Sequence, residues 1–201
     1  MTTPGKTKIW TPRRQRSGTW FPGIAMAMYM SVVVGLAYRQ GVSQTVMVLA
    51  ACFPLIWWFA TALLSQLANT PMRNELSRVF ARSHGVIDSP WSFVGVSTPS
   101  YKSPWDLHED VGLLIRKPDE LEFVGDSLAI QLKRSEIGRV VRKRHALSWF
   151  GLGSWIEIWP VDASGGCLLR IESRQKSTRL GNAWASDQLA ESLFEWHQPK
   201  N

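Results

Sequence analysis

The first third of the chain contains two long apolar segments, at residues 20–38 and 45–68. No charged side chain occurs from residue 40 to residue 72. A helix needs roughly 20 mostly apolar residues to cross the hydrocarbon core of a bilayer, and each segment is about that long. The connection at residues 39–44 is short, so the two helices must run antiparallel. The pattern therefore predicts a transmembrane α-hairpin over residues 20–69.

Small side chains recur every four residues along the first segment, at Gly23, Ala27, Ser31 and Gly35. This spacing places them on one face of a helix, where small residues allow another helix to approach closely. The face packs either on the second segment of the same hairpin or on another membrane protein. The sequence leaves both interpretations open.

The second segment contains a proline and a tryptophan pair in unusual places. Pro54 removes one helical hydrogen bond, and it therefore predicts a kink. Trp57 and Trp58 fall near the middle of the segment, whereas tryptophans usually gather at the two membrane surfaces. Either the segment boundaries are shifted and the pair marks a surface, or the rings pack deep against a protein, pigment or lipid.

Basic residues predict the orientation of the hairpin. Residues 1–19 form a polar tail with five basic and no acidic side chains, and Trp10 and Trp20 could lie at the headgroup level. Arg73, Arg78 and Arg82 follow the hairpin, while Arg39 alone lies in its loop. Positive residues favour the cytoplasmic side, so we expect an uncleaved anchor in the inner membrane with both termini in the cytoplasm.

The formal net charge is +7, but most of the excess lies beside the hairpin. Residues 73–201 carry 17 basic and 16 acidic side chains and are nearly neutral. A basic footprint on a folded domain is the usual mark of nucleic-acid binding. The charge distribution therefore predicts a membrane partner and no nucleic-acid partner.

Residues 70–110 are expected to form an amphipathic helix and a linker. Leu76, Val79 and Phe80 share one helical face, which lies either on the membrane surface or on the domain that follows. A short strand is predicted at residues 92–96. The sequence DLHED at residues 106–110 gathers His108 between carboxylates, but metal sites need three or four ligands, so a solvated loop is the favoured interpretation.

The remaining residues, 111–201, predict an antiparallel meander closed by one helix. Apolar and polar residues alternate over short segments between turns, at residues 111–116, 121–124, 128–132, 137–141, 154–159 and 167–172. Ala185, Leu189, Leu193 and Trp196 then recur at helical spacing, in a helix that Asn182 or Ser186 could cap.

Residues 112–144 (GLLIRKPDELEFVGDSLAIQLKRSEIGRVVRKR) contain a glycine-led strand, a second strand ending at Gly125-Asp126, and a third that runs into residues 134–137. In these features the segment resembles bacterial pleckstrin-homology-like domains related to the GRAM type. The resemblance implies an α+β protein with a partly open seven-stranded barrel, plugged at one end by the C-terminal helix. Six strands are clear, so residues 92–96 supply the seventh or the barrel is incomplete. The family implies binding, without specifying a ligand.

Candidate chemistry is sparse. A basic cluster comprises Lys133, Arg134, Arg139, Arg142, Lys143 and Arg144. If these side chains converge near the membrane they would attract anionic lipid, and if they do not they are a solvated strand face. No nucleophile elbow, phosphate loop or paired Cys/His spacing occurs, and Cys52 and Cys167 are poorly placed for a disulfide.

Three classes of function remain. The favoured one is a non-enzymatic accessory or scaffold subunit, in which the hairpin packs in a larger membrane assembly and the cytoplasmic domain docks proteins. The second is a module that senses anionic lipid through the basic cluster. The third is a membrane-bound enzyme whose site is assembled from residues distant in sequence.

Overall fold

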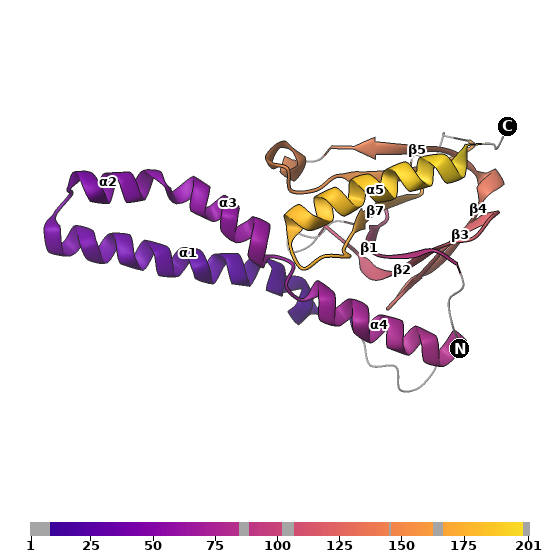
Figure 1. Ribbon diagram of the computed structural model, residues 1–201, viewed down its shortest axis with the longest axis horizontal. Helices are drawn as coiled ribbons and strands as arrows, with labels where there is room; N and C mark the ends of the chain where they lie inside the picture. Colours follow the sequence, from indigo (N-terminus) through magenta and orange to yellow (C-terminus); the bar gives the residue numbers. More distant parts are fainter. Residues whose placement is uncertain (1–8, 85–88, 102–106, 145, 163–166, 199–201) are drawn as a thin grey trace.

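The computed structural model describes residues 9–84, 89–101, 107–144, 146–162 and 167–198 (Figure 1). The helices are α1 (Pro12–Gln40), α2 (Gln44–Ala51), α3 (Phe53–Leu64), α4 (Asn69–His84) and α5 (Arg179–His197), with short 3-10 helices η1 (Arg134–Glu136) and η2 (Ala146–Phe150). The strands are β1 (Trp91–Ser97), β2 (Asp110–Arg116), β3 (Glu120–Gly125), β4 (Ala129–Lys133), β5 (Ile137–Lys143), β6 (Trp155–Pro160) and β7 (Leu169–Ser173). The fold is α+β, with a helical hairpin projecting from a curled sheet.

The hairpin consists of α1, α2 and α3. Thr11 caps α1 by accepting the backbone N–H of Arg14, and the helix ends at Gly41, which has a φ of 70°. The return helix is interrupted at Cys52, just before Pro54, and the chain bends there by 40°. This confirms the predicted kink, because proline can neither donate the next helical hydrogen bond nor fit against the preceding turn.

One helix near the N-terminus, Trp20–Gln40, is long and apolar enough to cross a membrane. The bent return arm, taken together with the helix that continues from it, passes the same test as a second span. Only 17% of the apolar window in Trp20–Gln40 is buried within the protein. Large side chains such as Met28 and Val34 therefore face outward along the hairpin.

Residues 9–19 differ from the polar tail that was expected over residues 1–19, whose first eight residues lie outside the described part of the chain. Helix α1 already begins at Pro12, and Ile9 and Trp10 are almost completely buried against the sheet. Trp10 therefore does not lie at a headgroup level. The apolar Ile9-Trp10 pair is the physical reason, because burying two large side chains outweighs the polar composition around them.

Seven antiparallel strands form one sheet in the order β4-β3-β2-β1-β7-β6-β5. The first strand, β1, lies at the centre and pairs with both β2 and β7, and the sheet curls about it into a half-barrel (Figure 1). The segment around residues 92–96 thus supplies the seventh strand. The half-barrel consequently begins at Trp91, within the region expected to be a linker.

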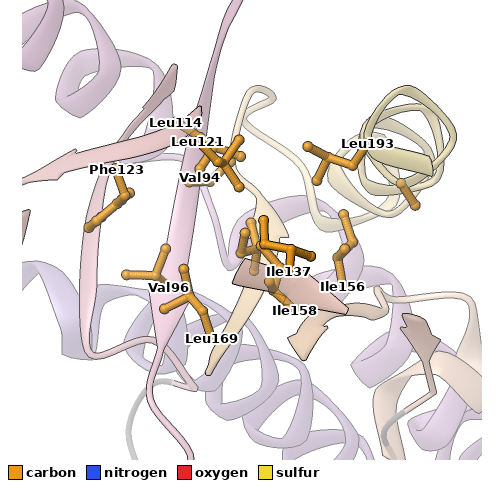
Figure 2. Packing of buried hydrophobic residues seen from close by; sticks show 12 residues of the cluster. Val94, Val96, Leu114, Leu121, Phe123, Ile137, Ile156, Ile158, Leu169 and Leu193 are labelled. Atoms are coloured by element: carbon orange, nitrogen blue, oxygen red, sulfur yellow. The ribbon is translucent and has the colours of Figure 1, made fainter. Parts of the chain in front are cut away.

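The main core lies inside the half-barrel. Apolar side chains from six strands and from α5 meet there, and Leu193 of α5 faces the strand residues across the interior (Figure 2). The buried members are Val94, Val96, Leu114, Leu121, Phe123, Ile137, Ile156, Ile158, Leu169, Ile171, Ala190 and Leu193. This arrangement, a curled seven-stranded sheet covered by a terminal helix, is compatible with a pleckstrin-homology-like fold.

A second core lies on the outer face of the sheet, beneath α4. Met72 and Leu76 of α4 pack with Trp10, Phe93 and Leu113, while Val79 and Phe80 pack at its margin. The apolar face of α4 therefore covers the half-barrel and does not lie on a membrane surface. Strand β2 is consequently buried on both faces, which explains its unbroken apolar run.

Helix α5 begins earlier than its apolar spacing predicted. Thr178 is the N-cap, and its side chain accepts the backbone N–H of Gly181. Asn182 and Ser186, the expected caps, lie inside the helix and are buried. The Ser186 hydroxyl accepts the backbone N–H of Ser173 at 2.8 Å, so it holds the helix to β7 instead.

Candidate functional site: the junction between hairpin and half-barrel

A buried polar junction joins the hairpin to the half-barrel. Residues 65–68 turn the chain between α3 and α4, and Gln66 and Asn69 are buried there. The Gln66 side-chain oxygen accepts hydrogen bonds from the amides of Asn69 and Asn182. One glutamine thus connects the end of the hairpin, the start of α4 and the start of α5.

The segment between β7 and α5 closes over this junction. Asn182 forms two hydrogen bonds with the backbone of Lys176, both 2.7 Å, and Asn69 donates to the same carbonyl at 3.0 Å. Arg73 of α4 donates to the carbonyl of Gln175 at 3.0 Å. These are largely side-chain to backbone bonds in a buried setting, where leaving a partner unpaired costs about 1–3 kcal/mol.

A chain of buried charged groups extends the junction into the sheet. Arg174 donates through Nε to Asn69 at 3.0 Å, and its guanidinium lies 4.7 Å from the centre of the Trp10 ring. Its Nη1 lies 3.4 Å from Nδ1 of His108, and Nε2 of His108 lies 3.1 Å from a carboxylate oxygen of Glu172. Removing one member of such a buried set leaves a charge uncompensated.

His108 takes part in this set, so the interpretation of the DLHED segment as a solvated loop was wrong at His108; Asp106 lies outside the described residues. His108 is buried, and Gly95 makes room for it, because a side chain on Gly95 would lie 2.2 Å from the imidazole. Among the described residues, no group of three or more His, Cys, Asp or Glu side chains is placed to hold a metal ion.

Asp110 organises the turn between β3 and β4. Its carboxylate accepts the backbone N–H groups of Val111, Ser127 and Leu128 at 2.7 to 2.8 Å. Burial raises the pKa of Asp110, and the three backbone hydrogen bonds offset part of that effect. Asp126, in the same turn, accepts the backbone N–H of Trp10 at 2.8 Å and so attaches the N-terminal segment to the sheet.

The small-residue face points away from the rest of the hairpin. Gly23, Ala27, Ser31 and Gly35 are all exposed, and side chains built on Gly23 and Gly35 would meet no atom within 4 Å. The Ser31 hydroxyl donates to the carbonyl of Ala27 at 2.8 Å, which satisfies it within the helix. The structure therefore does not bring this face against α2 or α3.

The tryptophan pair lies at the half-barrel end of the return arm. Trp57 is exposed on α3, while the indole N–H of Trp58 donates to the carbonyl of Phe150 in η2 at 3.0 Å. This contact joins the hairpin to the connection between β5 and β6.

The basic cluster does not converge at one place. Lys133 and Arg134 line a depression of about 900 Å³ that also includes His197, near the C-terminal end of α5. Arg142 and Arg144 line a second depression of about 440 Å³, with residues of η2 and of the first half of α5. Strand β5 runs between the two, so the cluster is divided over its length (Figure 1).

Three members of the cluster have partners on the sheet or on α5. Arg139 lies over the ring of Trp159, 4.4 Å from its centre. Lys143 lies 3.3 Å from Glu157, a buried carboxylate that also accepts from Arg170 at 3.0 Å. Arg142 forms an ion pair of 2.5 Å with Asp187 of α5.

Comparison with known proteins adds no family assignment. No protein-family model matches the chain, and no curated protein matches its sequence significantly.

Sequence reasoning missed the junction itself. Its members are widely separated along the chain; Asn69 and Arg174, for example, are 105 positions apart. Gln66 and Asn69 gave a weak signal. Two polar amides at the end of an otherwise apolar segment indicate that this end contacts polar groups. Their partners could not be named, because no local spacing connects them.

Proposed function

We propose that the protein is a non-enzymatic, integral membrane accessory or scaffold subunit. The hairpin crosses the inner membrane and packs in a larger assembly, and the half-barrel, a pleckstrin-homology-like domain, docks protein partners in the cytoplasm. The single observation that carries this proposal is the exposed small-residue face of α1. The hairpin's own contacts use another face, which contains the buried Met26 and Val33.

The membrane part of the proposal is supported by the exposed apolar surface of the hairpin. Large apolar groups that face outward along both arms have no favourable environment in water. The span Trp20–Gln40 is about 31 Å long at the helical rise per residue, which matches the hydrocarbon thickness. Trp10 is bonded to the half-barrel, and Arg14 forms an ion pair with Glu75 of α4. These two contacts support an anchor that is retained in the mature protein.

The docking part of the proposal is supported by the rigid junction. A flexible linker would let the half-barrel move freely, whereas the buried bonds at Gln66, Asn69 and Asn182 fix its position beside the hairpin. A fixed position suits a subunit that presents one surface to neighbouring proteins. The exposed small-residue face of α1 and the fixed position of the half-barrel are both features that suit a scaffold subunit.

Ala27→Leu combined with Ser31→Leu tests the assembly. The two leucines fill the small face, and small-to-large changes there prevent close helix approach. In mild detergent we expect the wild-type protein to elute as an assembly larger than a monomer, and the double variant to elute as a smaller species. Val32→Leu is the matched control, because Val32 is exposed on the same helix and lies about 100° around the helix axis from Ser31, outside the small face.

A monodisperse wild-type monomer without partners would contradict the proposal. If the double variant assembles as the wild-type protein does, the small face makes no contact in the assembly and the hairpin serves only as an anchor.

The second candidate function is an anionic-lipid-sensing module. The observation that favours it is the depression lined by Arg142 and Arg144, which lies beside η2 and therefore close to the hairpin. Only this part of the basic cluster is placed suitably, since Lys133 and Arg134 line the other depression.

A further inference from the structure

The connection between β5 and β6 carries large apolar side chains that the fold leaves uncovered. Trp149 and Phe150 of η2 are 81% and 55% exposed, respectively. Trp184 of α5 is also exposed, and it lines the same 440 Å³ depression as Trp149. Three exposed aromatic side chains in one place are unusual for a surface that meets only water.

This place adjoins the apolar hairpin. The carbonyl of Phe150 accepts the indole N–H of Trp58 on α3, so η2 lies directly against the return arm. Trp57, which is adjacent to Trp58 in sequence, is exposed on α3. Trp20 and Phe21 are exposed near the start of the apolar part of α1. Aromatic residues of the hairpin and of the half-barrel therefore gather at one end of the hairpin.

Basic side chains border the aromatic ones. Arg142 and Arg144 line the depression with Trp149 and Trp184, and both arginines are exposed. Asp187 is the acidic residue that lines the same depression, and it pairs with Arg142. Aromatic rings flanked by arginines suit the boundary between acyl chains and anionic headgroups.

We propose that η2 and the first half of α5 form a membrane-docking surface, the η2 patch, which consists of Trp149, Phe150, Trp184, Arg142 and Arg144. The aromatic side chains enter the interfacial layer of the bilayer that the hairpin crosses, and the arginines contact the phosphates of anionic lipid. The occupant is the lipid surface, because the patch is continuous with the apolar hairpin and its charge is complementary to anionic headgroups. This inference rests on the proposed membrane anchoring.

The patch also gives a physical role to the contact between Trp58 and Phe150. The hydrogen bond fixes η2 at a set position along α3, and so it sets the depth at which Trp149 lies relative to the hairpin. Together with the junction at Gln66 and Asn69, it holds the half-barrel against the membrane at two separated points.

Fluorescence quenching in vesicles tests the η2 patch with the full chain. An environment-sensitive dye is attached at Phe150→Cys, in a background in which Cys52 and Cys167 are serine and Trp149 is retained. The vesicles contain phosphatidylcholine alone or phosphatidylcholine with phosphatidylglycerol, and their lipids carry spin-label quenchers at the headgroup or in the acyl chain. We expect most of the dye fluorescence at residue 150 to be quenched by the shallow quencher.

Two reporter positions make the outcome decisive. Val161→Cys is the matched control, because Val161 is an exposed apolar residue at the opposite end of β6, and its dye should stay unquenched. Leu55→Cys reports on the hairpin, and its dye should be quenched by the acyl-chain label. Quenching at residue 55 with none at residue 150 overturns the η2 patch and leaves the membrane anchoring standing.

The remaining outcomes distinguish anchoring, headgroup contact and protein contact. No quenching at residue 55 overturns the anchoring, and the patch with it. Replacing Arg142 and Arg144 by glutamine should reduce quenching in anionic vesicles to the level seen in neutral ones, and an unchanged difference overturns the headgroup contact. A dye at residue 150 that is unquenched in vesicles but shielded in native membranes assigns the patch to a protein partner and overturns the lipid assignment.

Discussion

Asp110 shows how much one buried carboxylate contributes to this fold. Its two oxygens accept three backbone N–H groups, two of which close the turn between β3 and β4. Gly125 leaves the space for it, because a side chain there would lie 2.3 Å from the carboxylate. An amide NH2 in place of either carboxylate oxygen would point a hydrogen-bond donor at a backbone N–H, which is also a donor.

Asp110→Asn is therefore expected to destabilise the protein by about 1–3 kcal/mol, the cost of an unsatisfied buried group. Denaturant unfolding of the full chain in detergent, followed by tryptophan fluorescence, measures the change. Asp119→Asn is the control, since Asp119 is exposed in the turn between β2 and β3, and it should change stability by about 0.5 kcal/mol or less. Equal effects of the two changes would contradict the role of Asp110.

The sequence could not predict the environments of His108, Glu157 and Glu172. His108 was expected in a solvated loop, whereas the alternating segments around Glu157 and Glu172 carried no expectation for the surroundings of these two carboxylates. In the fold each is buried beside a charged or titratable partner: Glu157 beside Arg170, and Glu172 beside His108. Glu157 and Arg170 pair across β6 and β7, and only the register of the sheet reveals such a pair.

At the scale of elements, hydrophobic spacing was informative wherever one face of an element is buried. The strands from β2 to β7 and the apolar face of α4 follow the predicted pattern. The start of α5 does not, because Thr178 caps the helix before its apolar spacing begins. The segment before α1 differs as well, since two apolar residues are too few to form a periodic pattern.

Met72→Ala tests the packing of α4 on the sheet. Met72 is completely buried with Ile9, Trp10 and Phe93, so truncation leaves a cavity in the second core. Loss of a large buried side chain typically costs about 2–5 kcal/mol. We expect a stability loss in that range by denaturant unfolding, whereas Arg78→Ala on the exposed side of α4 should have little effect. A negligible loss for Met72→Ala would show that α4 is not docked.

At the scale of the whole molecule, the junction holds the hairpin and the half-barrel together, beside the contacts of Trp58 with Phe150 and of Trp10 with Asp126. Gln66 and Asn69 come from the hairpin side, and Asn182 from the half-barrel side. Hydrogen bonds from separate elements that share one partner are expected to act together, so removing two members should loosen the whole connection.

Asn69→Ala combined with Asn182→Ala is therefore expected to broaden the distance between hairpin and half-barrel. Spin labels at Val42→Cys on the hairpin tip and Ser135→Cys on η1 report that distance by pulsed electron resonance, in a background without native cysteines. The wild-type junction should give a narrow distribution and the double variant a broad one. Asn74→Ala, an exposed asparagine on α4, should leave the distribution narrow. A narrow distribution in all three proteins would contradict a junction held by these amides.

The attachment of Trp10 to Asp126 has a consequence for the order of events during synthesis. The two residues are separated by 116 positions, so the ribosome completes the hairpin, α4, β1, β2 and β3 before the partner of Trp10 exists. Closing so long a loop is entropically costly and belongs late in folding. Ile9 and Trp10 emerge long before their partners and are thus among the last residues to settle, and a version lacking them would carry an open hole beneath α4.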